Sequence, residues 1–128
     1  MKYSKATNYA LHTVVYMAQE SLEHPIGVKQ LAETQSVSPT YLSKILTKLA
    51  KEGIVRSISG VNGGYTLTIH WEELSFLDII QAIEGKASIF EDCLYQHEDC
   101  EIKNVMLMAE EKLEQELREH KIVALVKK

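Results

Sequence analysis

The sequence has few of the features that mark secreted, membrane-spanning or disordered chains. Its 128 residues include only 2 cysteines, which are too few for a disulfide framework. No apolar run approaches the roughly 20 residues that cross a bilayer, and the apolar run at 14–18 is too short for a secretory signal. Internal repeats and low-complexity tracts are also missing. We therefore expect a cytoplasmic protein with no membrane partner.

The residues that are present indicate one globular domain with an uneven charge. Hydrophobic residues make up 45% of the chain and charged residues 25%, a balance typical of a packed core with a solvated surface. Residues 1–66 carry 7 Lys/Arg against 4 Glu, whereas residues 67–128 carry 7 Lys/Arg against 14 Asp/Glu. The net charge of −4 therefore does not exclude a polyanionic ligand, but such a ligand must meet the first half of the chain.

Apolar residues recur with the helical period through the first half of the chain. This period predicts helices over 4–19 and 28–34, and a third helix that begins after Ser38 and ends near Gly53. Ser38 is a favourable N-cap, and Pro39 suits the first helical position because its missing N–H costs nothing there.

Beyond the third helix the apolar period changes from 3.6 to about 2, which predicts two β-strands over 54–58 and 65–69. The turn between them holds Gly60, Gly63 and Gly64. A phosphate-binding loop would need a helix after its glycines, and a strand follows here. The glycines therefore indicate a hairpin turn whose backbone can approach another molecule closely.

The second half of the chain is predicted to be helical with one irregular stretch. Ser75 and Asp78 form a capping box that opens a helix ending at Gly85. Residues 86–101 are irregular and acidic, and a long helix is expected over about 102–120. The last eight residues either continue that helix or form a short extra turn.

Three helices followed by a hairpin, with a tight turn between the second and third helices, predict a winged helix-turn-helix. The outward face of the third helix carries hydroxyl and lysine side chains, which suit phosphates and base edges. A merely solvated helix face is the alternative when this helix is considered alone. The residues that we predict to contact DNA are Ser38, Pro39, Thr40, Tyr41, Ser43, Lys44, Thr47, Lys48, Arg56, Ser59, Asn62 and Gly63.

Six motifs are spread over nearly the whole chain: Asn8-Tyr9-Ala10-Leu11, Leu31-Ala32, Val37-Ser38-x-x-Tyr41-Leu42, Leu46-x-x-Leu49-x-x-x-Gly53-Ile54-Val55, Gly60-x-x-Gly63-Gly64-Tyr65-x-Leu67 and Asp78-Ile79-Ile80-x-Ala82-Ile83-Glu84-Gly85. Together they resemble the IscR/NsrR/CymR group of bacterial winged-helix transcription regulators, the Rrf-two-type family. The resemblance implies a homodimer whose long C-terminal helices pack together. It also implies a palindromic operator in double-stranded DNA, read by two recognition helices and two wings.

The predicted fold is therefore mainly α with a small β-hairpin, a winged helix-turn-helix plus a long C-terminal dimerisation helix. Residues 1–85 would form the DNA-binding domain, 86–101 a sensory or effector loop, and 102–128 the dimerisation helix and tail. An apolar seam along the long helix provides the predicted dimer contacts, which are Ile102, Val105, Met106, Ala109, Leu113 and Leu117.

The chain departs from the cluster-binding members of the family that it resembles. Those members place three cysteines in the loop and gain a fourth ligand elsewhere, whereas this loop offers only Cys93 and Cys100. Two thiolates fall short of the four ligands of an iron–sulfur cluster, so we expect no cluster and assign no cofactor or metal. Ser43 and Ser59 also stand where the family often has Glu and Arg, which predicts a different or weaker operator.

The two cysteines allow several interpretations. They could be packing residues, a thiol switch that responds to an oxidant or small molecule, or a metal site together with His97. We assign Cys93 and Cys100 as the redox or effector residues, although the nearby carboxylates raise the pKa of a thiol and slow its reactions.

The expected function is that of a dimeric, sequence-specific transcription regulator. We expect a repressor that responds to a redox signal or another effector without an iron–sulfur cluster. The alternative is a winged-helix protein-interaction module that does not read DNA. An enzyme is not expected, because the acidic cysteine loop supplies neither an oriented base nor an oxyanion site.

Overall fold

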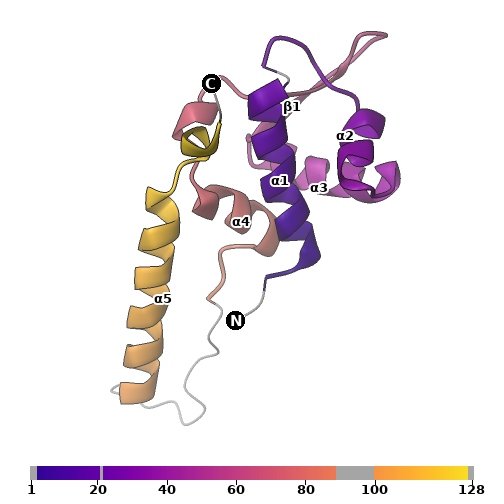
Figure 1. Ribbon diagram of the computed structural model, residues 1–128. Helices are drawn as coiled ribbons and strands as arrows, with labels where there is room; N and C mark the ends of the chain where they lie inside the picture. Colours follow the sequence, from indigo (N-terminus) through magenta and orange to yellow (C-terminus); the bar gives the residue numbers. More distant parts are fainter. Residues whose placement is uncertain (1–2, 21, 89–99, 127–128) are drawn as a thin grey trace.

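The computed structural model describes residues 3–20, 22–88 and 100–126 (Figure 1). It confirms the predicted fold class, since helices dominate and the strands form one antiparallel hairpin. In chain order the elements are α1 (Lys5–Glu20), α2 (Val28–Gln35), α3 (Pro39–Lys51), β1 (Val55–Ile58), β2 (Gly64–Leu67), η1 (Trp71–Glu73), α4 (Phe76–Glu84), α5 (Glu101–Glu119) and η2 (Ile122–Leu125).

The core is built around α1, which packs against α3 and α4. Val14 and Met17 on α1 are completely buried, as are Leu42 and Leu46 on α3. The apolar stripe that predicted each helix is therefore the face that the helix buries. Because α3 is held to α1 through this core, its opposite face is presented to solvent in a fixed orientation.

The ends of α3 are set by local chemistry. The Ser38 hydroxyl accepts a hydrogen bond from the Tyr41 N–H at 3.1 Å, and Pro39 occupies the first turn. At the other end Gly53 has a φ of 75°, and its N–H donates to the Ala50 carbonyl at 3.0 Å. The cap and the left-handed glycine fix where the helix begins and ends, as the sequence predicted.

The hairpin is joined to the body by a third extended segment. Strands β1 and β2 pair with Val55 opposite Leu67 and Ile58 opposite Gly64. Ile26 forms a bridge to Tyr65, with backbone N–H···O distances of 3.0 and 2.9 Å in the two directions. Strand β2 is therefore anchored, close to the turn, to the segment between α1 and α2, which limits how far the hairpin can move.

The chain returns to its core after the long helix. The predicted capping box is present, with the Ser75 hydroxyl accepting from the Asp78 N–H at 3.1 Å and the Asp78 carboxylate accepting from the Ser75 N–H at 2.9 Å. The Ile122 N–H donates to the Leu74 carbonyl at 2.9 Å, and the Ile122 side chain is completely buried in the same core as α1. Residues 122–125 thus form a short extra turn that packs against the core.

Helix α5 lies at one side of the molecule and packs against α4 (Figure 1). None of its residues is buried. Ile102, Val105 and Met106, all near its amino-terminal end, are 73%, 63% and 45% exposed. Among the helices that the structure describes, none is long and apolar enough to cross a bilayer.

Candidate nucleic-acid interface

The solvent-facing side of α3 displays the hydroxyl and lysine side chains that the sequence singled out. Thr40, Lys44, Thr47 and Lys48 are all exposed, whereas Leu49 on the inner face is fully buried. Ser38 and Pro39 are exposed at the amino-terminal end of the helix. The helix thus presents a continuous polar strip of about 20 Å, which is the length of its 13 residues at roughly 1.5 Å per residue.

Two residues on this face are more constrained than the sequence indicated. The Tyr41 ring stacks edge-on against Tyr9 of α1 at 5.7 Å, and Tyr41 is only 37% exposed. Ser43 is half-buried, and its carbonyl accepts a hydrogen bond from the Thr47 hydroxyl at 2.8 Å. Tyr41 is therefore held in one orientation, while Ser43 offers less surface to a ligand than Thr40 or Lys44.

The hairpin follows α3 in the chain and presents its turn to solvent. Arg56, Ser59 and Asn62 are exposed, and Gly63 is half-buried. Val61 at the tip is fully exposed. Val61 was not among the predicted contact residues, and the sequence signal for it is a β-branched residue between Gly60 and Asn62 in the turn.

The glycines of the turn lie in the predicted hairpin and are also constrained by the fold itself. A Cβ on Gly63 would collide with the Ile58 carbonyl oxygen, and a Cβ on Gly64 would lie 2.5 Å from the Ile26 carbonyl oxygen. Gly64 also has a φ of 148°. Both glycines are therefore required by close contacts within the protein, whether or not DNA approaches the turn.

Glu84, at the end of α4, is hydrogen-bonded to the start of α1, a contact that the sequence did not indicate. Its Oε2 accepts hydrogen bonds from the Ser4 N–H at 2.9 Å, the Ser4 hydroxyl at 2.8 Å and the Thr7 hydroxyl at 2.6 Å. The Thr7 hydrogen bond, the Ser4 hydrogen bonds and the nearby charge of Lys48 lower the pKa of Glu84. The carboxylate thus links the start of α1 to α4, on the side where Lys48 of α3 lies.

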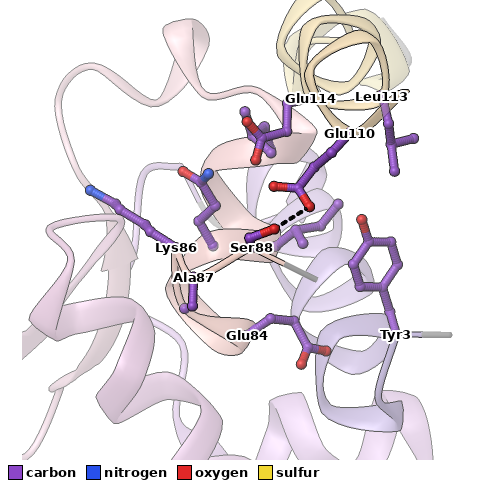
Figure 2. Close-up of a pocket in the computed structure, with 12 residues that line it drawn as sticks. Tyr3, Glu84, Lys86, Ala87, Ser88, Glu110, Leu113 and Glu114 are labelled. Atoms are coloured by element: carbon purple, nitrogen blue, oxygen red, sulfur yellow. Dashed lines mark hydrogen bonds between the residues drawn. The ribbon is translucent and has the colours of Figure 1, made fainter. Parts of the chain in front are cut away.

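A cleft of ≈ 400 Å³ separates α4 from α5. Leu77 and Ile80 of α4 and Leu113 of α5 give it apolar walls, and Tyr3 also lines it. Figure 2 shows the Tyr3 ring between Glu84 and α5, and the Ser88 hydroxyl donating to Glu110 at 2.8 Å. Burial, followed by the charges of Glu84, Glu114 and Glu110, raises the pKa of Tyr3. This cleft lies where the long helix α5 packs against α4.

Only one of the two cysteines falls in the described ranges. Cys100 is half-buried and is the N-cap of α5, where its sulfur accepts from the Lys103 N–H at 3.5 Å. Cys93, and with it the predicted pairing or switch, lies outside the described residues. Within the described ranges no group of three His, Cys, Asp or Glu side chains is placed to hold a metal ion.

Comparison with known proteins places these features in one family. The Rrf2 family model, described as "Iron-dependent Transcriptional regulator", matches residues 3–128. The chain is 34% identical over 88 residues to the HTH-type transcriptional regulator CymR of Bacillus subtilis, and 31% identical over 91 residues to NsrR of the same organism. These matches cover 69% and 71% of this chain, and they span 64% and 62% of the relatives' own lengths.

Solved structures give the same result for the fold. The structure of CymR (YrzC), the global cysteine regulator of B. subtilis, matches with a TM-score of 0.83 at 26% identity, over 98% of this chain and 95% of that one. The structure of T. potens IscR matches with a TM-score of 0.75 at 27% identity, over 96% of this chain and 84% of that one. The winged helix-turn-helix prediction is confirmed by these similarities.

The family description mentions iron, and the donor set of this chain does not fit an iron–sulfur cluster. The whole sequence supplies two thiols, against the four ligands that such a cluster takes. The sulfur of Cys100 is in addition a helix cap for α5. We therefore assign no step of the function to an iron cofactor.

Proposed function

Because the chain belongs to the Rrf2 family, whose named members are transcriptional regulators and not enzymes, we propose that it is a dimeric, sequence-specific DNA-binding repressor. The observation that carries this proposal is the polar face of α3. Lys44 and Lys48 are exposed there, on a helix whose opposite face is locked into the core. A rigid helix with a lysine strip on its solvent side suits entry into a major groove.

Within this interface the lysines and the hydroxyl-bearing residues would have different roles. Lys44 and Lys48 would neutralise backbone phosphates, which gives affinity without sequence information. Thr40 and the constrained Tyr41 would discriminate between base edges, because hydroxyls can donate to and accept from bases. The hairpin tip, with Asn62 and without the arginine that Ser59 replaces, would add affinity and little discrimination.

The dimer is proposed from the apolar face of α5. Ile102, Val105, Met106 and Ala109 recur at helical spacing and are exposed to solvent. Exposed apolar residues in such a contiguous group mark an interaction surface. Pairing two copies would join two weak half-site contacts into one tight operator contact, and occupation of the operator would repress transcription.

The signal is proposed to act through Cys93 and Cys100, as an oxidant-sensitive thiol pair or a small-molecule effector site. Cys100 begins α5, so a chemical change at its sulfur would alter the cap of the proposed dimerisation helix. The proposed switch would then act at the end of α5 that also carries Ile102.

The test of DNA reading is selection of bound fragments from random duplex DNA by the purified protein, followed by titration of the selected sequence against salt. A palindromic consensus, and a binding constant that falls steeply with salt, would support the proposal. Recovery of random sequences, or binding that ignores salt, would instead favour a winged-helix protein-interaction module, for which the acidic second half of the chain is the supporting observation.

A further inference from the structure

The tyrosine at the amino-terminal end of α3 lies against a second tyrosine from another helix. Tyr41 is the third residue of α3, and its ring meets the ring of Tyr9 on α1 edge-on, with centroids 5.7 Å apart and planes at 84°. Aromatic pairs prefer this geometry, because the positive edge of one ring faces the negative face of the other. The two rings therefore form a specific contact between α1 and the helix that is proposed to read DNA.

Tyr41 stands at the border between the buried and the exposed faces of α3. Its neighbours differ in this respect, since Leu42 is completely buried and Thr40 is exposed. Part of the Tyr41 side chain is open to a ligand, and the rest is covered by the protein. The first residues of a recognition helix are those that meet base edges in the major groove. The covered part of Tyr41 is therefore where the protein can control how the open part is presented.

Tyr9 is held in place by hydrogen bonds that reach α2. It is half-buried and packs against the core. Its carbonyl oxygen accepts a hydrogen bond from the Thr13 hydroxyl at 2.7 Å, and Thr13 is completely buried. The Thr13 hydroxyl oxygen in turn accepts from the side-chain amide of Gln35, the last residue of α2. The backbone that carries Tyr9 is thus tied to α2, and its ring gives Tyr41 a fixed support.

A side chain that is already ordered loses less entropy when it binds. A tyrosine on an open helix surface samples several rotamers, and binding must then select one of them. The Tyr9 ring reduces that cost, because it favours the Tyr41 rotamer in which the two rings meet. Reading a base edge needs a fixed direction, whereas a phosphate contact by a flexible lysine does not. The effect of Tyr9 should therefore appear in discrimination between DNA sequences and not in affinity for random DNA.

We propose that Tyr9 is a specificity-determining residue of this regulator, which acts by positioning Tyr41 and without touching DNA itself. The inference rests on the proposed function, since it requires that α3 reads base edges. It also gives the motif Asn8-Tyr9-Ala10-Leu11 two roles, because Ala10 is completely buried in the core while the Tyr9 ring supports α3. A residue of α1 thus belongs to the reading site, although it is distant from Tyr41 along the chain.

Binding titrations with two DNA duplexes of equal length test the role of the Tyr9 ring. One duplex carries the palindrome that the wild-type protein selects, and the other carries the same base pairs in scrambled order. For Tyr9→Leu we expect the ratio of the two affinities to fall about three- to tenfold, the factor that an edge-to-face ring pair contributes. The affinity for the scrambled duplex and its salt dependence should stay at the wild-type values, because Lys44 and Lys48 are unchanged.

Two further variants separate positioning from other roles of the side chain. Tyr9→Phe keeps the ring and removes only the hydroxyl, so we expect the wild-type ratio. A loss as large as that of Tyr9→Leu would overturn the inference, because the hydroxyl would then be the active group. Trp71→Leu removes another half-buried aromatic ring that packs against the core, and it should lower the temperature of unfolding without changing the ratio. A ratio that falls in Trp71→Leu as well would overturn the inference, because lost stability alone would explain the effect.

A double-mutant cycle shows whether Tyr9 acts through Tyr41. Tyr41→Ala should lower the ratio by itself, and adding Tyr9→Leu should lower it no further, because the ring that Tyr9 positions is gone. Additive losses would overturn the inference and make Tyr9 an independent determinant. A wild-type protein that binds both duplexes equally would contradict the proposed function, whereas a wild-type ratio retained in Tyr9→Leu would overturn the positioning role alone.

Discussion

At the scale of residues, the carboxylate of Glu84 connects α4 to the start of α1. One of its oxygens accepts three hydrogen bonds from Ser4 and Thr7, which caps α1 from another helix. Its pKa is lowered from the ordinary 4.5, chiefly by the Thr7 hydrogen bond. The stabilisation is therefore complete above pH 4.5 and is lost as the pH falls through the lower folded value.

The change Glu84→Gln keeps the shape of the side chain and removes its charge. At pH 7 we expect the free energy of unfolding to fall by less than about 1 kcal/mol, because charge-assisted bonds become neutral ones and solvent screens this exposed carboxylate. Thermal unfolding measured from pH 7 downward tests this, and the difference between the two proteins should shrink as the pH falls below 4.5. Glu72→Gln, an exposed carboxylate outside this network, should leave unfolding unchanged at every pH. A difference between wild type and Glu84→Gln that grows as the pH falls would contradict the linkage.

Gly63 is expected to matter for stability before it matters for DNA. In Gly63→Ala the new methyl group meets the Ile58 carbonyl oxygen, so the hairpin must shift, at a cost above about 1 kcal/mol. Asn62→Ala, in the same turn and exposed, should leave stability unchanged and affect only DNA affinity. Chemical denaturation and DNA titration of both variants check this. A Gly63→Ala protein with wild-type stability would show that the turn relaxes freely.

At the scale of elements, the salt dependence of DNA affinity tests the role of α3. If Lys44 and Lys48 each contact a phosphate, replacing both with alanine should lower the slope of log affinity against log salt by about 1.8, at about 0.9 for each phosphate. The loss should be similar for every DNA sequence, since phosphates carry no sequence information. The control is Lys112→Ala, an exposed lysine on α5. Equal slopes for wild type and the double variant would remove α3 from the interface.

The sequence predicted those elements whose ends are decided locally. Each of these helix ends is set by residues only a few positions apart, as at Ser38, at Gly53 and in the Ser75–Asp78 capping box. Their local patterns therefore indicate the helix boundaries. The Ile26 bridge and the burial of Ile122 depend on partners far along the chain, and no local pattern reveals them. The exposure of most α3 residues followed from periodicity, but which of them touch DNA stays a prediction.

The predicted apolar seam of α5 shows, within one helix, the same difference between what local spacing predicts and what depends on distant partners. Periodicity placed Ile102, Val105, Leu113 and Leu117 on one face. The structure divides that face, because Leu113 and Leu117 are half-buried and Leu113 lines the cleft against α4, whereas Ile102 and Val105 face solvent. Spacing alone cannot tell an intramolecular contact from an intermolecular one. Substitution of Leu113 would therefore disturb the body of the protein and is a poor test of dimerisation.

At the scale of the whole molecule, the decisive prediction concerns cooperation between two half-sites. In Ile102→Asp/Val105→Asp the new charges lie at positions 73% and 63% exposed, so the monomer should fold as wild type does while the apolar contact between copies is lost. Affinity for the selected palindrome should then fall to that for a single half-site, because linked binding no longer raises the local concentration.

Sedimentation equilibrium and titration of full and half operators measure the two effects separately. The matched control is Leu107→Asp, which changes an apolar residue 39% exposed that lies off the predicted face and should leave the dimer intact. If the double variant became monomeric yet bound the palindrome as tightly as wild type, each chain would read the DNA alone. Dimerisation would then serve another role, and α3 would have to supply the full affinity from one recognition helix.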